Sequence, residues 1–565
     1  MSKRIPLAHA RGYTSPPAAN PQRGRRGSIF WISALWFTMA IVRADVTLAP
    51  LFTDHAVLQR DKLVPIWGKA GPGEKVTVTF AGQTLRTTPG NDGRWIVLLE
   101  PMPANAQGAD LVVAGKNTLT VHDVVVGEVW LCSGQSNMEW PVSRAMDASR
   151  EIASANFPLL RHVRIEHVVT EFPAATVATS GWQSATPENV GTFTAVGYFF
   201  ARDLHQKLGV PVGLVHSSWG GTPIESWLSP AALASNPAFA VVAERWGRNL
   251  ADFAANQTAY EAKLAAWTKA EAEAKAAPPA KTAPATKKKS APKRADPAAS
   301  YNDWLRKNPR PRPPRGPGDP WTPSGLFNAM INPLAPAALR GVVWYQGENN
   351  AERAAEYPPL FTTLITSWRA HFGQDDLAFY WVNLANYEVN GDATRRSYAF
   401  LREAQTKALA LPHTGQALAI DIGDPTNIHP TNKQEVGRRL ALLAKNRLYG
   451  IVCDDTGPTF VSAAPEGKPG AQAPSAGSGQ AMRVRFTNAT GGLVAHEKPV
   501  QSLELAGSDR VFYPAEGKID RDTLVVTSAQ VREPIAVRYA WTNAPQANLY
   551  NGAGLPAVPF RSDDW

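Results

Sequence analysis

The sequence has few cysteines and none of the common motifs of closely spaced metal ligands. Cys132 and Cys453 are the only cysteines among 565 residues, so no disulfide framework is expected and Cys132 is predicted to be a free, packed thiol. The eleven histidines show neither His-x-x-x-His nor His-Glu-x-x-His spacing. This pattern disfavours a zinc hydrolase, and we predict neither a metal site nor a cofactor.

The sequence also lacks an apolar run long enough to span a membrane. The longest candidate, Ile29 to Val42, is too short for a transmembrane helix but has the length of a signal-peptide core. Three arginines precede it, and it ends in the small-x-small triplet Val42-Arg43-Ala44. We therefore expect residues 1–44 to be a basic tail plus signal peptide, with an uncleaved anchor as the alternative. The mature protein would begin near Asp45, in the periplasm or outside the cell, and would not associate with a membrane.

The net charge of +10 is concentrated in two segments. Residues 1–26 carry six Lys or Arg and no acidic residue, and residues 261–315 carry fourteen Lys or Arg against five acidic residues. The rest of the chain is net acidic. Because a nucleic-acid surface needs basic residues clustered on a folded face, nucleic acid is not predicted as a partner.

The hydrophobic pattern changes along the chain and predicts several domains. Short strands with turn signals such as Asn91-Asp92-Gly93 predict an N-terminal β-sandwich. Strand-like runs then alternate with helical ones, which is typical of an α/β fold with a parallel sheet flanked by helices. The predicted parts are the sandwich at 45–123, two halves of the α/β domain at 124–228 and 326–450, a helical and Pro/Lys-rich insertion at 229–325, and a C-terminal β domain at 451–565.

Individual elements follow from the same periodicities. The predicted parallel strands are Val129–Cys132, Val212–Ser218, Gly341–Tyr345, Ala378–Leu384 and Gln416–Ile422. The predicted helices are Ala195–Leu208, Tyr357–Phe372, Ala399–Leu409 and Lys433–Leu448. Within the insertion, residues 231–277 have helical spacing, whereas residues 277–320 are rich in Pro, Lys and Arg and are expected to be flexible or extended.

A serine follows one buried strand directly. The apolar run from Val124 to Cys132 stops at Ser133-Gly134, and Ser136 comes two residues later. Ligands bind at the carboxyl ends of strands in open α/β sheets, so Ser136 is a candidate nucleophile. The alternative is an ordinary strand-to-helix turn in which Ser136 or Asn137 caps a helix.

Three further polar loops follow predicted strands and supply the other groups that acyl transfer needs. His429 has a suitable pKa for a general base, and Asp424 is the candidate carboxylate that orients it. The candidate oxyanion donors are the N–H groups of Ser136 and Gly220 and the side chain of Asn349, with Gln346 as second choice. No Gly-x-Ser-x-Gly elbow surrounds Ser136, which argues against a standard α/β-hydrolase.

Four ordered blocks resemble the SGNH-hydrolase blocks of the sialate O-acetylesterase family. They are Gly134–Met138, Trp219–Trp227, Trp344–Glu348 and Ile428-His429-Pro430 with Lys433. The resemblance covers most of residues 45–565 and implies removal of acetyl esters from sugars by a metal-independent serine mechanism, with Ser136 as nucleophile and His429 as base. It also makes Asn137, Trp219 and Glu348 candidate substrate-binding residues.

One position departs from the wider pattern, which has an aspartate three residues before the histidine. Thr426 stands there, so Asp424 is the substitute, and a Ser136/His429 dyad is the alternative. The substrate is predicted to be an O-acetylated sugar, either a sialic acid or a plant polysaccharide such as xyloglucan or xylan. A sugar carrying a carboxylate would need an arginine, for which Arg402 is the candidate. The rival functions are a noncatalytic carbohydrate-binding protein, and a lipase or thioesterase of the same fold.

Overall fold

The computed structural model describes residues 45–276, 297–466, 480–496 and 499–565. The predicted signal segment lies outside these residues, and so do residues 277–296 of the predicted Pro/Lys-rich segment. All described residues belong to one compact unit. A search of their helices finds none with the length and apolar character needed to cross a membrane.

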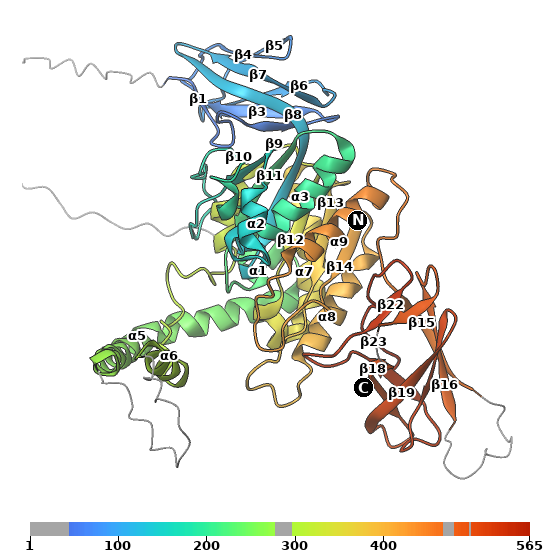
Figure 1. Cartoon of the computed structure of the whole chain (residues 1–565). Coiled ribbons are helices and arrows are strands. Elements are labelled where there is room, and N and C mark those ends of the chain that lie inside the picture. Colours follow the sequence, from blue (N-terminus) through green and yellow to red (C-terminus); the bar gives the residue numbers. More distant parts are fainter. Residues whose placement is uncertain (1–44, 277–296, 467–479, 497–498) are drawn as a thin grey trace, which may run out of the picture. The chain divides into compact units, whose positions relative to one another are not determined.

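The N-terminal region consists of β-strands, as predicted (Figure 1). One sheet has the strand order β1-β3-β6, and β4 pairs with β5 and β7 in antiparallel fashion. In β6 buried and exposed residues alternate strictly, because successive side chains of a strand point to opposite faces. The bounds are β1 Thr47–Leu48, β2 Val57–Gln59, β3 Val64–Lys69, β4 Val76–Phe80, β5 Gln83–Thr87, β6 Arg94–Leu99 and β7 Asn105–Ala114.

Strand β8, Thr118–Gly134, belongs to both the N-terminal region and the central parallel sheet (Figure 1). Its first part pairs with β7 in antiparallel fashion, and its second part lies parallel to β11 and β12. The order across the central sheet is β10-β9-β11-β8-β12-β13-β14. The other bounds are β9 Phe157–Arg164, β10 Gln183–Ala185, β11 Val212–Ser218, β12 Gly341–Tyr345, β13 Ala378–Asn383 and β14 Thr414–Leu418.

The inner strands are buried along their whole length because helices leave neither face open to solvent. Every residue of β11, β12 and β13 is buried. The main helices are α3 Ala195–Leu208, α7 Tyr357–Phe372, α8 Ser397–Lys407 and α9 Lys433–Arg447. Both α3 and α7 end at a glycine with positive φ, Gly209 and Gly373, which explains why their ends could be read from the sequence.

The remaining helices are short or lie in the insertion. Helix α5, Ala240–Ala276, confirms the helical part of the predicted insertion. The expectation of an extended segment is wrong for residues 297–307, which form helix α6, Pro297–Lys307. The others are α1 Ser136–Glu139, α2 Ala148–Ala153 and α4 Pro230–Ala234, with short 3-10 helices at 142–144, 190–192, 224–227, 237–239, 332–334, 348–356 and 408–410 and a π-helix at 327–331.

The C-terminal region is again built of β-strands. Its larger sheet has the order β15-β16-β20-β19-β18-β21-β23, with antiparallel pairing, and β17 pairs with β22. The predicted combination of a helix-flanked sheet with β regions before and after it is therefore confirmed. The bounds are β15 Thr459–Glu466, β16 Ala481–Thr487, β17 Leu493–Ala495, β18 Val500–Ala506, β19 Phe512–Asp520, β20 Thr523–Thr527, β21 Ala536–Tyr539, β22 Leu549–Asn551 and β23 Phe560–Arg561.

The strand predicted at Gln416–Ile422 is shifted. It begins earlier and ends at Leu418, so the following apolar residues lie beyond the strand. Ile420 is fully buried, but it packs in the hydrophobic cluster of the C-terminal β region together with residues such as Leu549 and Tyr539. Its apolar character therefore reflects contact with another part of the fold.

A buried carboxylate anchors β8 upstream of the Ser136 turn. Glu128 is fully buried and accepts hydrogen bonds from Arg60 Nε at 2.5 Å and Arg340 Nε at 2.7 Å. Gln59 Nε2 donates to the same carboxylate at 3.1 Å. These contacts join β8 to β2 and to the segment that leads into β12.

We predict that Glu128→Ala lowers the free energy of unfolding by about 3–5 kcal/mol, because it leaves two arginines without their buried partner. Chemical denaturation followed by circular dichroism measures this change. Glu273→Ala is the matched control, since Glu273 is exposed on helix α5. Equal stability of the two variants would contradict the anchoring role of Glu128.

Candidate active site

The turn after β8 can form only with glycine at position 134. Gly134 has φ +133°, and a Cβ there would lie 2.2 Å from the carbonyl oxygen of Tyr345 on the neighbouring strand β12. Gln135 N donates to that same oxygen at 2.9 Å. The chain then enters α1, where Ser136 is partly exposed between the buried residues Gln135 and Asn137. The predicted strand-to-turn transition therefore presents a serine hydroxyl at the sheet's carboxyl edge.

The structure brings Ser136 and His429 together across 293 positions of sequence. His429 Nε2 lies 2.8 Å from Ser136 Oγ. The imidazole stacks on Trp140, with ring centroids 4.8 Å apart and planes 18° from parallel. Partial burial lowers the pKa of His429 below 6.5, and the cations of Lys433 and Arg144 lower it further. A neutral imidazole at this distance can accept the serine proton.

Asp424 does not accompany this pair. Its carboxylate accepts hydrogen bonds from the backbone N–H of Thr426 at 2.8 Å and from the Thr426 hydroxyl at 2.7 Å. These local bonds lower the pKa of Asp424. In the described part of the chain, no hydrogen bond or ion pair joins Asp424 to His429. The assignment of Asp424 as the orienting acid is therefore not supported, because a side-chain turn within its own loop occupies the carboxylate.

Gly220 lies beside the nucleophile, as the sequence predicts for an oxyanion donor. A Cβ at Gly220 would be 3.1 Å from Ser136 Cβ. Its N–H donates to Glu139 Oε2 at 2.8 Å, so a carboxylate already occupies this donor. Sequence reasoning missed Glu139, although it lies only three residues after Ser136.

Trp219 and the Glu139 carboxylate share a neighbour, His167. The Trp219 ring stacks on His167, with centroids 4.2 Å apart and nearly parallel planes. His167 Nε2 lies 3.3 Å from Glu139 Oε1 and 2.9 Å from the Ser218 carbonyl oxygen. Trp219 is partly exposed, so the face of the site beside Gly220 includes an aromatic ring.

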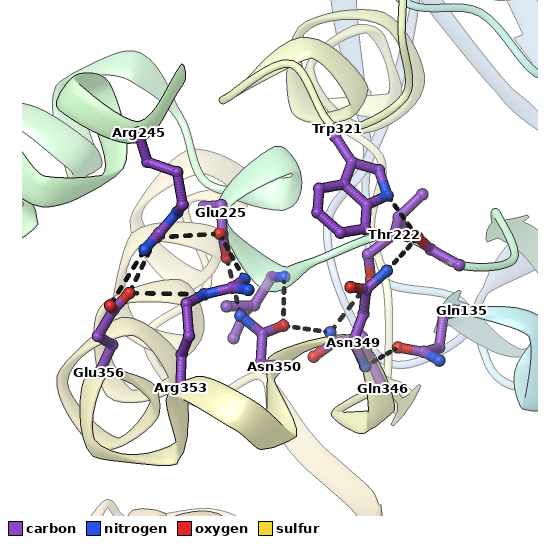
Figure 2. Close-up of polar contacts among 12 residues, drawn as sticks. Gln135, Thr222, Glu225, Arg245, Trp321, Gln346, Asn349, Asn350, Arg353 and Glu356 are labelled. Atoms are coloured by element: carbon purple, nitrogen blue, oxygen red, sulfur yellow. Dashed lines mark hydrogen bonds and ion pairs between the residues drawn. The ribbon is translucent and has the colours of Figure 1, made fainter. Parts of the chain in front are cut away.

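Gln346 is used inside the protein. It is fully buried, and its Nε2 donates to Thr222 O at 3.2 Å and to Asn350 Oδ1 at 2.7 Å (Figure 2). Its Oε1 accepts from the Tyr357 hydroxyl at 2.9 Å. Because both N–H groups of the amide are occupied, Gln346 has none to offer an oxyanion. It braces the loop after β11 and is not a second-choice donor.

Asn349 faces the same loop from the partly exposed side (Figure 2). Its Nδ2 donates to the carbonyl oxygen of Gly221, which also accepts from Trp321 Nε1 at 2.6 Å. One N–H of the Asn349 amide is therefore used, and the second has no partner among the described residues. Trp321 comes from the last residues of the predicted insertion, and no pattern in the sequence indicated that it reaches this loop.

A cluster of ion pairs around the buried Glu225 lies next to the loops that carry Gln346 and Asn349 (Figure 2). Glu225, 4% exposed, accepts from Arg353 at 3.0 Å and from Asn350 Nδ2 at 2.9 Å. Arg245 of helix α5 pairs with Glu356 at 2.9 Å and approaches Glu225 at 3.4 Å. The insertion is thus connected by ion pairs to the polar network that holds Asn350 and Gln346.

Two of the candidate substrate-binding residues, Asn137 and Glu348, are joined by a hydrogen bond within a network that includes Lys433.

Arg402 is 1% exposed, and its guanidinium donates at 2.8 Å to the carbonyl oxygens of Leu384, Ala385, Thr542 and Asn543. Arg402 therefore ties α8 to the C-terminal region and cannot bind a substrate carboxylate. Burial also lowers its pKa to about 9.

The described residues contain no cluster of three or more His, Cys, Asp or Glu side chains arranged to hold a metal ion. The chemically usable groups at the site are a serine hydroxyl, a histidine whose pKa lies below 6.5, backbone and amide N–H groups, and partly exposed aromatic rings.

Comparisons with known proteins agree with this set of groups. A family model described as "carbohydrate esterase, sialic acid-specific acetylesterase" matches residues 316–445. The sialate O-acetylesterase of Rattus norvegicus is 31% identical, and the alignment covers 91% of this chain and 93% of the rat protein. The Mus musculus enzyme is 30% identical with the same coverage. The crystal structure of a carbohydrate acetylesterase from Xanthomonas citri is 36% identical, covers 92% of this chain and 100% of its own, and has a TM-score of 0.72. The chain belongs to the sialate O-acetylesterase family of carboxylic ester hydrolases.

Proposed function

We propose that this protein removes O-acetyl groups from carbohydrates through an acetyl-serine intermediate, on an SGNH-hydrolase-type α/β core. The observation that carries the proposal is the 2.8 Å contact between Ser136 Oγ and His429 Nε2. Family membership gives the reaction class, and the lowered pKa of His429 makes it neutral, and therefore able to act as a base, at neutral pH.

In the proposed first step, Ser136 Oγ attacks the acetyl carbonyl carbon while His429 Nε2 takes the hydroxyl proton. The C–O bond to the sugar then breaks, and His429 returns the proton to the departing sugar oxygen. In the second step His429 removes a proton from water, which attacks the acetyl-serine. Acetate leaves and Ser136 recovers its proton.

The carbonyl oxygen becomes an oxyanion in both steps and needs preorganised donors. The proposed donors are the N–H groups of Ser136 and Gly220 and the free N–H of Asn349. Gly220 N–H already bonds Glu139 Oε2 at 2.8 Å, so Gly220 can serve only if the oxyanion displaces this carboxylate. We propose a Ser136/His429 dyad. Stacking on Trp140 orients the imidazole ring, and the hydrogen bond from His429 N to Asn427 Oδ1 holds the backbone of the histidine loop.

The sugar is the open part of the proposal. The names of the mouse and rat relatives point to sialic acids, whose carboxylate would need a cationic partner. Arg402 cannot serve, so neutral acetylated polysaccharides such as xyloglucan or xylan are the second candidate. The partly exposed rings of Trp140, Trp219 and Trp321 favour a sugar ligand of either kind, because pyranose rings stack on aromatic faces. An exported protein with the predicted leader at residues 1–44 would meet either substrate outside the cytoplasm.

The nucleophile is tested by Ser136→Ala and His429→Ala with an aryl acetate as substrate. Each variant should lose at least about 10³-fold in kcat, since the two side chains act as one unit. For the same reason the double variant should be about as slow as either single variant. Wild-type rates in Ser136→Ala would refute the proposed function, and so would the absence of acetate release from every acetylated sugar tested.

The pH dependence follows from His429. Because the imidazole must be neutral, kcat/KM should fall as pH drops through the lowered pKa, with a midpoint below 6.5. Arg144→Gln removes one of the cations that lower this pKa, so the midpoint should move to higher pH. Arg150→Gln removes an exposed arginine paired with Asp147 and should leave it unmoved. The measurement is kcat/KM for an aryl acetate as a function of pH, and a wild-type midpoint above 6.5 would contradict the assignment.

The partly exposed rings of Trp140, Trp219 and Trp321 form an aromatic rim, and Trp321→Ala tests its role in sugar binding. This change should raise KM for an acetylated xyloglucan or sialoside oligosaccharide by roughly tenfold, which corresponds to a loss of about 1.4 kcal/mol in binding free energy. The KM for a small aryl acetate should change much less, because that substrate does not reach the rim. Trp565→Ala, at the far end of the chain, is the control. Equal effects on both substrates would show that Trp321 only supports the Gly221 loop.

A further inference from the structure

The side chain of Asn137 joins the two segments that carry the reacting groups. Asn137 follows Ser136 directly and is 1% exposed. Its Nδ2 donates to the carbonyl oxygen of Ile428, the residue before His429, at 3.0 Å. The same nitrogen donates to Glu348 Oε1 at 2.6 Å. One amide therefore connects the nucleophile turn, the histidine loop and the loop after β12.

An amide can make these contacts in only one of its two orientations. Oxygen and nitrogen ends are nearly equal in shape, but one only accepts hydrogen bonds and the other only donates them. Lys433 Nζ donates to Asn137 Oδ1 at 2.5 Å, and an ammonium group can only donate. Lys433 thus fixes the oxygen toward itself and the NH₂ group toward Ile428 O and Glu348.

Lys433 occupies an unusual position for a lysine. It is the first residue of α9, it is fully buried, and its Nζ lies 5.3 Å from the centroid of the Tyr345 ring. Burial lowers its pKa to about 7, because removing the charged ammonium group from water costs free energy. Since a methionine would fill a similar volume without this cost, packing alone does not explain a lysine here.

We propose that Lys433 is a positioning residue for the Ser136–His429 pair, acting through the side chain of Asn137. Lys433 holds the Asn137 amide in the orientation that clamps the histidine loop to the nucleophile turn. The proposal rests on the esterase function proposed above, because the readout is ester hydrolysis.

The charge of Lys433 has a second, separable effect on His429. It lowers the pKa of the imidazole, together with Arg144. The other ionisable groups near Lys433 are Glu348, which raises the pKa of Lys433, and the Tyr345 hydroxyl, whose pKa is raised by burial. Removing the ammonium should therefore move the acid limb of kcat/KM to higher pH, which loss of packing alone would not do.

The main test is Lys433→Met, which keeps the buried volume and removes the donor. We expect kcat for an aryl acetate to fall by about 10²-fold, the effect of misplacing reacting groups by about 1 Å, with KM nearly unchanged. The acid limb should also move to higher pH. Lys445→Met is the matched control on the same helix, where Lys445 pairs with Asp203 at 2.8 Å, and it should keep the wild-type kcat. Wild-type kcat, or a lowered kcat with an unmoved acid limb, in Lys433→Met would overturn the proposal.

A double-mutant cycle with Asn137→Leu tests the route through Asn137. If Lys433 acts through this amide, Lys433→Met should cost less than about twofold in kcat when Asn137 is already leucine. Multiplicative losses would mean that Lys433 acts independently of Asn137 and would overturn the proposal. The Ser136→Ala result separates the two hypotheses: if that variant is inactive while Lys433→Met is fully active, only the positioning role fails.

Asn137→Asp gives an answer even if Lys433→Met does not fold. It keeps the volume and the acceptor for Lys433, but an ionised carboxylate cannot donate to Ile428 O. The change also places a carboxylate against Glu348 Oε1, which Asn137 Nδ2 contacts at 2.6 Å, so the melting temperature should fall. A loss of kcat similar to that of Lys433→Met is expected at a temperature where circular dichroism shows the variant to be folded. Full activity of Asn137→Asp would show that the clamp is not needed for catalysis.

Discussion

The hydrogen bond between Ser136 Oγ and His429 Nε2 depends on two backbone features, the turn at the end of β8 and the start of helix α9. Gly134 allows β8 to turn directly against the Tyr345 carbonyl, so the serine emerges at the sheet's carboxyl edge. Helix α9 begins just after the histidine loop, with Asn432 as its N-cap. Because buried contacts fix both the turn after β8 and the histidine loop, Ser136 Oγ and His429 Nε2 lie 2.8 Å apart although the two residues are distant in sequence.

The sequence was informative wherever a local signal and the tertiary fold agreed. Helices α3 and α7 have their predicted bounds because apolar periodicity runs up to a glycine that ends each helix. Strands β11 and β12 were also recognisable, because a strand buried on both faces has a continuous apolar run. The pairing of Ser136 with His429 could be predicted because the carboxyl ends of parallel strands lie at one edge of the sheet, although β12 and β13 separate β8 from β14.

Side chains whose partners come from distant segments could not be predicted. Arg402 looked like a ligand for a carboxylate, but its acceptors are carbonyl groups at 384–385 and 542–543. Asp424 is a different case, because its partner is local: it looked like the third catalytic group, but Asp-x-Thr spacing favours the turn that it forms with Thr426. Ile420 was read as part of a strand although its apolar neighbours lie in the C-terminal region. Trp321 carried no pattern that a local rule could detect, and Lys433 was noted only as part of a family block, without a role.

Strand β8 has a consequence for how this protein can be altered. Its residues 118–126 form the antiparallel edge with β7, and the same uninterrupted strand ends at Gly134, beside the nucleophile. The amino-terminal β region is therefore not a detachable module joined through a linker. Deleting it, or exchanging it for the equivalent region of a relative, would cut into the middle strand of the catalytic sheet and change the register that sets Ser136. The outer loops of this region can be altered without cutting strand β8, but the region can be replaced only together with the sheet.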